Sequence, residues 1–148
     1  MVSDFLAPAS YVELLGTRPN QLFFQIQTKG YMSSEKLKSE LSLARSMLEV
    51  DAANQLPIGV GFLCWRLEMP NSAELELLSI TLESNVKAVW FAFGSEIGRW
   101  VNVVRDHDRK TGNTTAIFVL VSSVEEAVLA FQRWKPDVIV AQGFTPFL

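Results

Sequence analysis

The sequence predicts an α/β fold with a parallel sheet, arranged as part of a TIM (β/α)8 barrel. Four apolar runs carry this prediction, at residues 59–65, 88–94, 116–121 and 138–143, and their starts are 29, 28 and 22 residues apart. The runs are continuously apolar because a parallel strand is covered on both faces. Each stretch between them has the pattern of one amphipathic helix, so the repeat is a strand followed by a helix.

A barrel is favoured over an open sheet because the spacing of the runs is even and no long crossover interrupts it. In a barrel the helices cover one face of the sheet, whereas in an open doubly wound sheet they cover both. A complete (β/α)8 barrel needs about 200–250 residues. The 148 residues are therefore expected to form roughly half of a barrel, from its second to its sixth strand.

The composition is that of an ordinary globular domain, with 49% hydrophobic and 20% charged residues. The net charge of −3 and the absence of a basic cluster argue against a nucleic-acid partner. No apolar stretch approaches the roughly 20 residues that a membrane helix needs, and the N-terminus lacks the pattern of a signal peptide. Cys64 is the only cysteine, so we expect a reducing, cytoplasmic location. No histidine is expected near it to lower its pKa, so we expect a core residue.

The first helix is expected to follow a less regular N-terminal segment, in which residues 22–26 could form a strand. Ser33 or Ser34 can cap this helix. Its buried stripe has the spacing i, i+4, i+7 and i+11, at Leu37, Leu41, Ala44 and Leu48.

Three further helices are expected between the apolar runs, each with a capping residue at its start. Lys135-Pro136 ends the last of them, because proline cannot continue the hydrogen-bond ladder. The expected caps are Asn71 with Glu74, Ser95, and either Ser122 with Glu125 or Ser123 with Glu126. The expected buried stripes are Leu75, Leu78 and Leu82; Ile97, Trp100, Val101 and Val104; and Val124, Ala127, Val128 and Phe131.

Chemistry is expected at the edge of the sheet where the strands end, since α/β folds place their sites there. Gln142 and Gly143 end the last apolar run at this edge. An amide side chain pointing out of the sheet could bond a planar heterocycle as both donor and acceptor. Gly59 and Gly61 lie within the first run, where glycine permits close approach by a ligand or by a neighbouring backbone.

The remaining candidates for chemistry are less well placed. His107 is the only histidine, and it falls after a helix, in an expected solvated turn at the opposite edge of the sheet. Asp106 and Asp108 stand beside Arg109 and Lys110, which makes a poor set of metal ligands. We therefore assign no metal site.

Five segments between residues 30 and 143 together resemble a known family. They are GYMSSEKLKSELSLARSML, LPIGVGFLCWRL, ELLSITLESNVKAVWFAFGSEIGRWV, IFVLVSSVEEA and PDVIVAQG. The resemblance is to the nitronate monooxygenase family, formerly called 2-nitropropane dioxygenases, in its fungal-type branch. It implies an FMN-dependent TIM barrel that oxidises alkyl nitronates with molecular oxygen. It also implies that Gln142 and Gly143 contact the flavin and that Gly61 lines the flavin face.

Relative to that family, the chain is expected to be truncated at both ends. It would then consist of a divergent segment at residues 1–29, a partial barrel at 30–143 and an aberrant tail at 144–148. The family's catalytic-base histidine and its flavin-phosphate loops have no counterpart in these segments. We therefore expect no catalytic residue here and no turnover of nitronates, although the flavin and a nitronate remain the expected ligands.

Two alternative functions stay open. One is a non-catalytic half-barrel that binds a partner or assembles with itself; the other is a flavin-type enoyl-thioester reductase, which shares the barrel and the strand end. Self-association or aggregation is expected because the inner face of a half-barrel has no opposite wall and its edge strands are unpaired. The residues expected on that inner face are Val60, Phe62, Val89, Phe91, Ile117, Val119 and Ile139.

Overall fold

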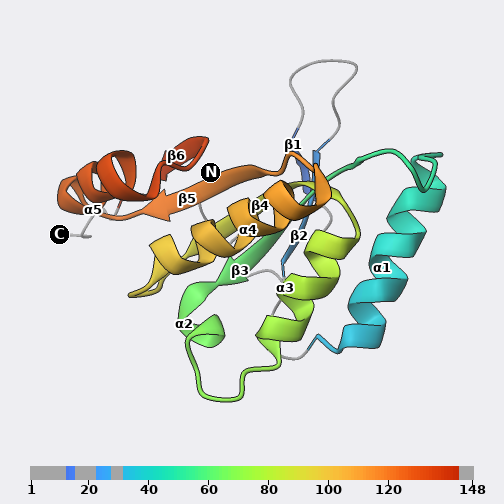
Figure 1. Ribbon diagram of the computed structural model, residues 1–148, viewed down its shortest axis with the longest axis horizontal. Coiled ribbons are helices and arrows are strands. Elements are labelled where there is room, and N and C mark those ends of the chain that lie inside the picture. Colours follow the sequence, from blue (N-terminus) through green and yellow to red (C-terminus); the bar gives the residue numbers. More distant parts are fainter. Residues whose placement is uncertain (1–12, 16–22, 28–31, 144–148) are drawn as a thin grey trace, which may run out of the picture.

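The computed structural model of the chain describes residues 13–15, 23–27 and 32–143. These residues form a six-stranded sheet in which the strand order follows the chain, from β1 to β6 (Figure 1). The first two strands are antiparallel, and every later strand pairs with its predecessor in parallel. The strands are β1 Glu13–Leu15, β2 Phe23–Gln27, β3 Leu56–Leu63, β4 Val86–Ala92, β5 Ala116–Val121 and β6 Val138–Ala141.

The α/β class and the parallel sheet expected from the four apolar runs are confirmed. The possible strand at residues 22–26 is also present, as β2, whereas the short β1 was not expected. β4 ends before Phe93, whose φ of 57° turns the backbone out of the strand. The expected tail at 144–148 and most of the expected N-terminal segment lie outside the described residues.

The helices connect neighbouring strands, and α1, α3 and α4 lie side by side over one face of the sheet (Figure 1). The last helix, α5, continues without a break into a π-helical turn, η2. Within the described ranges, no helix is long and apolar enough to cross a membrane. The helices are α1 Ser34–Met47, α2 Cys64–Leu67, α3 Glu74–Glu83, α4 Ile97–Thr111, α5 Val124–Leu129 and η2 Ala130–Trp134.

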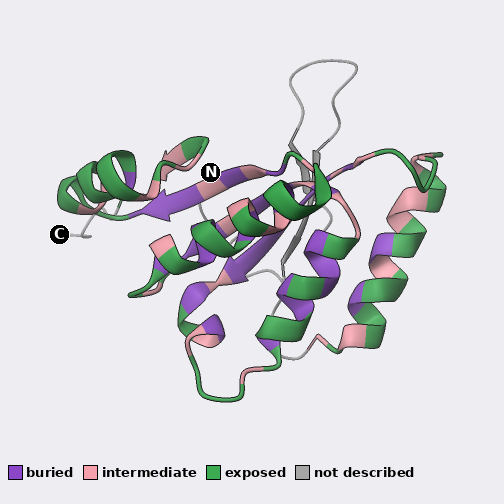
Figure 2. Cartoon of the chain, viewed as in Figure 1, coloured by how far each residue is buried: buried purple, intermediate pink, exposed green. Residues whose placement is uncertain are grey.

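The hydrophobic core lies between the sheet and these helices, and Figure 2 shows the buried residues concentrated on the strands and on the inner sides of α3 and α4. Val89, Phe91, Ile117 and Val119 are fully buried there. They belong to the set expected on the inner face of a half-barrel, and that expectation is wrong. These side chains pack against the helices, because alternate residues of a strand point to opposite faces and both faces of these runs are apolar.

The opposite face, which no described helix covers, carries the intervening residues of the same strands; we call it the helix-free face. Gly59 pairs with Ala88 and Trp90 pairs with Phe118 in the strand registers. The rings of Trp90 and Phe118 stack with their centroids 4.5 Å apart. A methyl group added at Gly59 would lie 3.4 Å from the Trp90 indole. The group that closely approaches this glycine is therefore the Trp90 side chain, and not a ligand.

The capping residue and the buried stripe were predicted correctly for α1 but not for α3. The Ser33 side chain caps α1 as expected, and Leu37 and Leu41 are buried. The expected box of Asn71 with Glu74 is wrong, because Asn71 has a φ of 54° and the Glu74 N–H donates to Ser72 Oγ instead. The exposed fraction of Leu75 is 44%, so the buried stripe of α3 runs through Leu77, Leu78, Thr81 and Leu82.

The helix α4 buries the four residues expected of it and then extends further than expected. Its last residue is Thr111, and Gly112 follows in the left-handed region with a φ of 76°. His107 therefore lies within a helix, and the prediction that it follows a helix in a solvated turn is wrong. The positive φ suits glycine, which carries no Cβ to clash in that region.

The helix α5 has the expected cap and an unexpected orientation. Ser123 Oγ accepts from the Glu126 N–H at 3.1 Å, and the Glu126 carboxylate accepts from the Ser122 N–H at 2.9 Å. Of the expected buried stripe, only Ala127 packs against the core. The rest is wrong, since Val124, Val128 and Phe131 are exposed and α5 has no fully buried residue. Ala130, in η2, is the residue that reaches the core.

Side-chain hydrogen bonds connect the loops at the edge of the sheet where the parallel strands begin. Arg45 donates to the backbone carbonyls of Asp51, Asn54 and Ser84 at 2.8–2.9 Å. Other bonds of this edge join Asp108 to Thr115 and Arg105 to Asp137, and Gln55 reaches the carbonyls of Val86 and Thr114. In α/β barrels this edge serves stability, whereas the opposite edge carries the chemistry.

Candidate functional site

The candidate site is the edge of the sheet at which β3, β4, β5 and β6 end. Parallel strands bring the segments that follow them to one edge, where α/β proteins bind ligands. Residues 64–68 follow β3, residues 93–96 follow β4, residues 122–123 follow β5, and residues 142–143 follow β6. We call this the carboxyl edge.

Glu68 connects two of these segments, and no pattern in the sequence predicts this role. Its carboxylate accepts hydrogen bonds from the backbone N–H groups of Ser95 at 3.1 Å and Glu96 at 2.7 Å, and from the Ser95 hydroxyl at 3.0 Å. A carboxylate at a helix N-terminus satisfies unpaired N–H groups and interacts favourably with the helix dipole. The expected cap by Ser95 is wrong, because α4 begins after Glu96 without a side-chain cap. Glu68, 27 residues from Ser95 in sequence, instead holds the two residues that lead into α4.

These hydrogen bonds set the charge state of Glu68. Desolvation by itself would raise the pKa of this carboxyl, but the bonds from the backbone of Glu96 and Ser95 and from the Ser95 hydroxyl outweigh it. The pKa of Glu68 is consequently lowered from its ordinary value. Glu68 is thus a permanent anion near neutral pH, already bonded within the protein.

The turn between β4 and α4 is packed so closely that only glycine fits at its centre. A Cβ at Gly94 would overlap the Cβ of Cys64 and the carboxylate of Glu68. The Trp65 N–H also donates to the Phe93 carbonyl at 2.9 Å, which ties the end of β3 to the end of β4. This half of the carboxyl edge is rigid and filled by the protein itself.

Gln142 occupies the other half of the carboxyl edge, where the sequence predicted it. Its N–H donates to the Val121 carbonyl at 2.8 Å, so the β5–β6 ladder continues one residue past β6. Ile139 packs on the core, and strand alternation therefore places Gln142 on the helix-free face. Its Oε1 atom is shielded from solvent and has no hydrogen-bond partner in the described part of the chain.

The other two predicted flavin contacts are not adjacent to Gln142. Gly61 lies near the end of β3, opposite Trp90 in the register, and alternation puts it on the same helix-free face. The strands β4 and β5 stand between Gly61 and Gln142. Gly143 is exposed, and a Cβ there would meet no atom within 4 Å. The structure thus places the three residues at one edge without bringing them into contact.

Cys64 is confirmed as a core residue. Its side chain is fully buried at the start of α2, and burial is the main cause that raises the pKa of the thiol to about 12. A thiol with such a pKa is protonated at neutral pH and is a poor nucleophile. Cys64 therefore contributes packing to the carboxyl edge and no chemistry.

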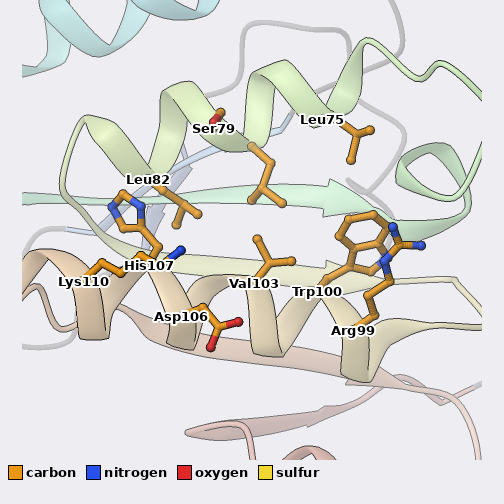
Figure 3. Close-up of a pocket in the computed structure, with 10 residues that line it drawn as sticks. Leu75, Ser79, Leu82, Arg99, Trp100, Val103, Asp106, His107 and Lys110 are labelled. Carbon is orange, nitrogen blue, oxygen red and sulfur yellow. The ribbon is translucent and has the colours of Figure 1, made fainter.

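His107 lies in a different feature, a groove of about 440 Å³ between α3 and α4. Figure 3 shows His107 and Lys110 at one end of this groove, with Trp100 and Arg99 at the other. The groove is on the outer side of the helices, and none of the predicted site residues lines it. His107 is thus separated from the carboxyl edge by the length of α4.

Within residues 32–143, no group of three or more histidine, cysteine, aspartate or glutamate side chains is arranged to hold a metal ion. Comparisons with protein-family models, with curated proteins and with solved structures find no match for this chain.

Proposed function

We propose that the chain forms the flavin-facing wall of an FMN-dependent oxidoreductase of the nitronate monooxygenase type. In this proposal the flavin ring lies at the carboxyl edge, on the helix-free face, with Gln142 as its hydrogen-bonding partner. Gly143 would leave room for the ring, and Gly61, which is buried, would belong to the wall behind it. The observation that carries the proposal is the Oε1 atom of Gln142, which is shielded from solvent and has no hydrogen-bond partner among residues 13–15, 23–27 and 32–143.

A buried carbonyl oxygen without a hydrogen bond costs about 1–3 kcal/mol, so such an atom marks a place where a partner is missing. The edge of a flavin ring offers both N–H donors and carbonyl acceptors, and a carboxamide can match one of each. The neighbouring Gly143 has open space around its Cα. These residues fit the edge of a planar heterocycle, and FMN, when bound, would supply the redox chemistry.

The strand order supports a barrel wall as the finer description of the fold. In doubly wound sheets the strand order reverses at a switch point, and helices cover both faces. Here the order from β1 to β6 follows the chain, and α1, α3 and α4 lie on one face (Figure 1). That arrangement favours roughly half of a (β/α)8 barrel, from the second to the sixth strand of the complete barrel.

The proposal does not assign a catalytic base to this chain. The only histidine of the sequence, His107, lies in the last turns of α4, away from the carboxyl edge. General-base catalysis typically contributes about 10²–10⁴-fold to a rate. We therefore expect the purified chain to bind FMN without oxidising nitronates, and oxygen uptake with an alkyl nitronate measures this. Turnover well above the rate of free FMN would show that the chain does supply a base.

Flavin binding is tested by titrating FMN with the purified chain and following flavin fluorescence. Gln142→Leu removes the carboxamide at similar size, and we expect it to weaken FMN binding about tenfold to a hundredfold. Gln132→Leu, at an exposed position of η2, is the matched control and should bind FMN like the parent. No binding by the parent, or equal affinities of the parent and Gln142→Leu, would overturn the proposal.

A second function, as a self-assembling module, is favoured by one specific observation. Val124 and Phe131 expose 75% and 74% of their surface on α5 and η2. Exposed apolar residues grouped in this way mark interaction surfaces. This surface lies on a helix, whereas the sequence placed the self-association surface on the sheet.

A further inference from the structure

The surface of α5 and η2 that faces away from the core carries a regular apolar stripe, which we call the α5 seam. It consists of Val124, Val128 and Phe131, whose exposed fractions are 75%, 47% and 74%. Their spacing of i, i+4 and i+7 places them on one side of a helix. It is the spacing by which helices pair through a narrow apolar seam.

The opposite side of the same helix is firmly attached to the domain. Ala130 is fully buried in the core, and Ala127 and Trp134 pack against it. The indole of Trp134 lies directly over Gly98 of α4, where a Cβ would overlap it. The seam is therefore presented on a rigid support, because the helix cannot turn its apolar side inward without leaving these contacts.

The charges along this helix are separated by sign. Glu125 stands at its beginning, and Arg133 and Lys135 stand at its end. None of these three makes an ion pair among the described residues. The helix thus has an acidic end and a basic end, with the apolar seam between them.

This distribution of charge favours a second copy of the same helix as the partner of the α5 seam. A second copy of the helix, laid antiparallel along the seam, would place its basic end beside Glu125 and its acidic end beside Arg133. A parallel copy would instead bring like charges together, which is unfavourable. An antiparallel pair of identical helices is related by a two-fold axis, the commonest symmetry of protein dimers.

We propose that the chain forms a two-fold dimer through the α5 seam, with the two helices antiparallel. The interface is separate from the carboxyl edge, so its existence does not depend on flavin binding. Three partly exposed side chains per copy form a small interface, and interfaces that bury less than about 1,200 Å² associate weakly. We therefore expect a reversible dimer in the micromolar range.

Analytical ultracentrifugation of the full chain from roughly 1 to 100 µM tests the seam, a range suited to weak interfaces. Phe131→Glu should raise the dimer dissociation constant at least about tenfold, because it places a charge where the proposed interface would bury an aromatic side chain. Met47→Glu alters an equally exposed apolar residue, 75% exposed on α1, and should leave dimerisation unchanged. Circular dichroism and thermal unfolding establish that both variants are folded. A parent that is monomeric at 100 µM, or a dimer that Phe131→Glu does not weaken, would overturn the proposal.

A charge-reversal cycle tests the antiparallel orientation. Glu125→Lys and Arg133→Glu should each weaken the dimer several-fold, and the double variant should recover most of the loss because the pairing is restored with opposite signs. Single variants without effect, or a double variant weaker than either single one, would contradict an antiparallel pairing of two copies. Pairing through the edge strand β6 or the helix-free face would appear as a dimer insensitive to all of these changes, and it would likewise overturn the proposal.

Discussion

Gly94 occupies a position where a single methyl group has no room. The Cβ of an alanine there would overlap both the Cys64 side chain and the Glu68 carboxylate. Gly94→Ala must therefore displace α2 or the start of α4, at a cost of about 3 kcal/mol, the upper end of the usual penalty for overpacking. Urea unfolding measures this cost. Gly143→Ala, where a Cβ would meet nothing within 4 Å, should unfold like the parent, and equal stability of the two variants would contradict the packing described.

Cys64 allows a second test at the scale of one residue. Because burial raises the pKa of its thiol to about 12, almost no thiolate exists in the folded protein at pH 8. We expect a thiol reagent such as DTNB to modify the native chain at a small fraction of the rate seen in urea. Rapid modification of the native chain, with circular dichroism unchanged, would show that the thiol is accessible.

The carboxylate of Glu68 shows how one residue determines the start of an element, the helix α4. Since its pKa is lowered in the folded state, Glu68 contributes stability above its unfolded value, near 4.5, and loses that contribution as the pH falls through the folded value. Glu68→Gln should cost about 1 kcal/mol at pH 7, because hydrogen bonds to a charged acceptor are stronger than those to a neutral amide. The difference from the parent should disappear at strongly acidic pH. A difference that stays constant with pH would mean that the charge of Glu68 does not matter.

Asp108 joins α4 to the start of β5 at the opposite edge of the sheet. It is buried and accepts hydrogen bonds from the Thr115 N–H at 2.8 Å and from the Thr115 hydroxyl at 2.9 Å. Asp108→Ala leaves both donors buried without partners and should lower the free energy of unfolding by about 2–3 kcal/mol. Asp106→Ala, two residues earlier in α4 and in an exposed ion pair with Arg109, should change it by less than about 0.5 kcal/mol. Similar losses in the two variants would show that the buried bonds are unimportant.

The helices show which features of an element can be predicted from sequence. α1 and the buried stripe of α4 follow directly from apolar residues at helical spacing. α5 does not, because Val124, Val128 and Phe131 have the same spacing and yet point to solvent. Spacing shows that apolar residues share one side of a helix, but it does not show what that side meets. The residues that hold the helix starts differ in the same way. The Ser123 cap of α5 is local and was predicted, whereas Glu68 reaches the segment before α4 from a distant part of the sequence.

At the scale of the whole molecule, the parallel sheet could be predicted, but the side of it that carries the core could not. A continuous apolar run indicates that both faces of a strand are buried, but it does not indicate which face the helices cover. The core forms where large side chains such as Phe91 meet the helices, whereas the other face alternates glycine and alanine with Trp90 and Phe118. The position of Gln142 at the end of β6 could be predicted, because the end of a strand determines the edge of the sheet at which a residue lies. That prediction does not require knowing which face of the sheet the helices cover.

This asymmetry of the sheet leads to a prediction for the whole molecule. Ile117 on β5 is fully buried among the helices, whereas Val138, on the helix-free face of the neighbouring β6, is 39% exposed. Ile117→Ala should lower the free energy of unfolding by about 2–4 kcal/mol, and Val138→Ala by less than about 1 kcal/mol. Urea unfolding of both variants, at concentrations below the dimer dissociation constant, measures the two values without a contribution from association. If Val138→Ala were the more destabilising of the two, the principal core would lie on the helix-free face. The helices would then be peripheral, and the assignment of the core to the helix-covered face of the sheet would have to be reversed.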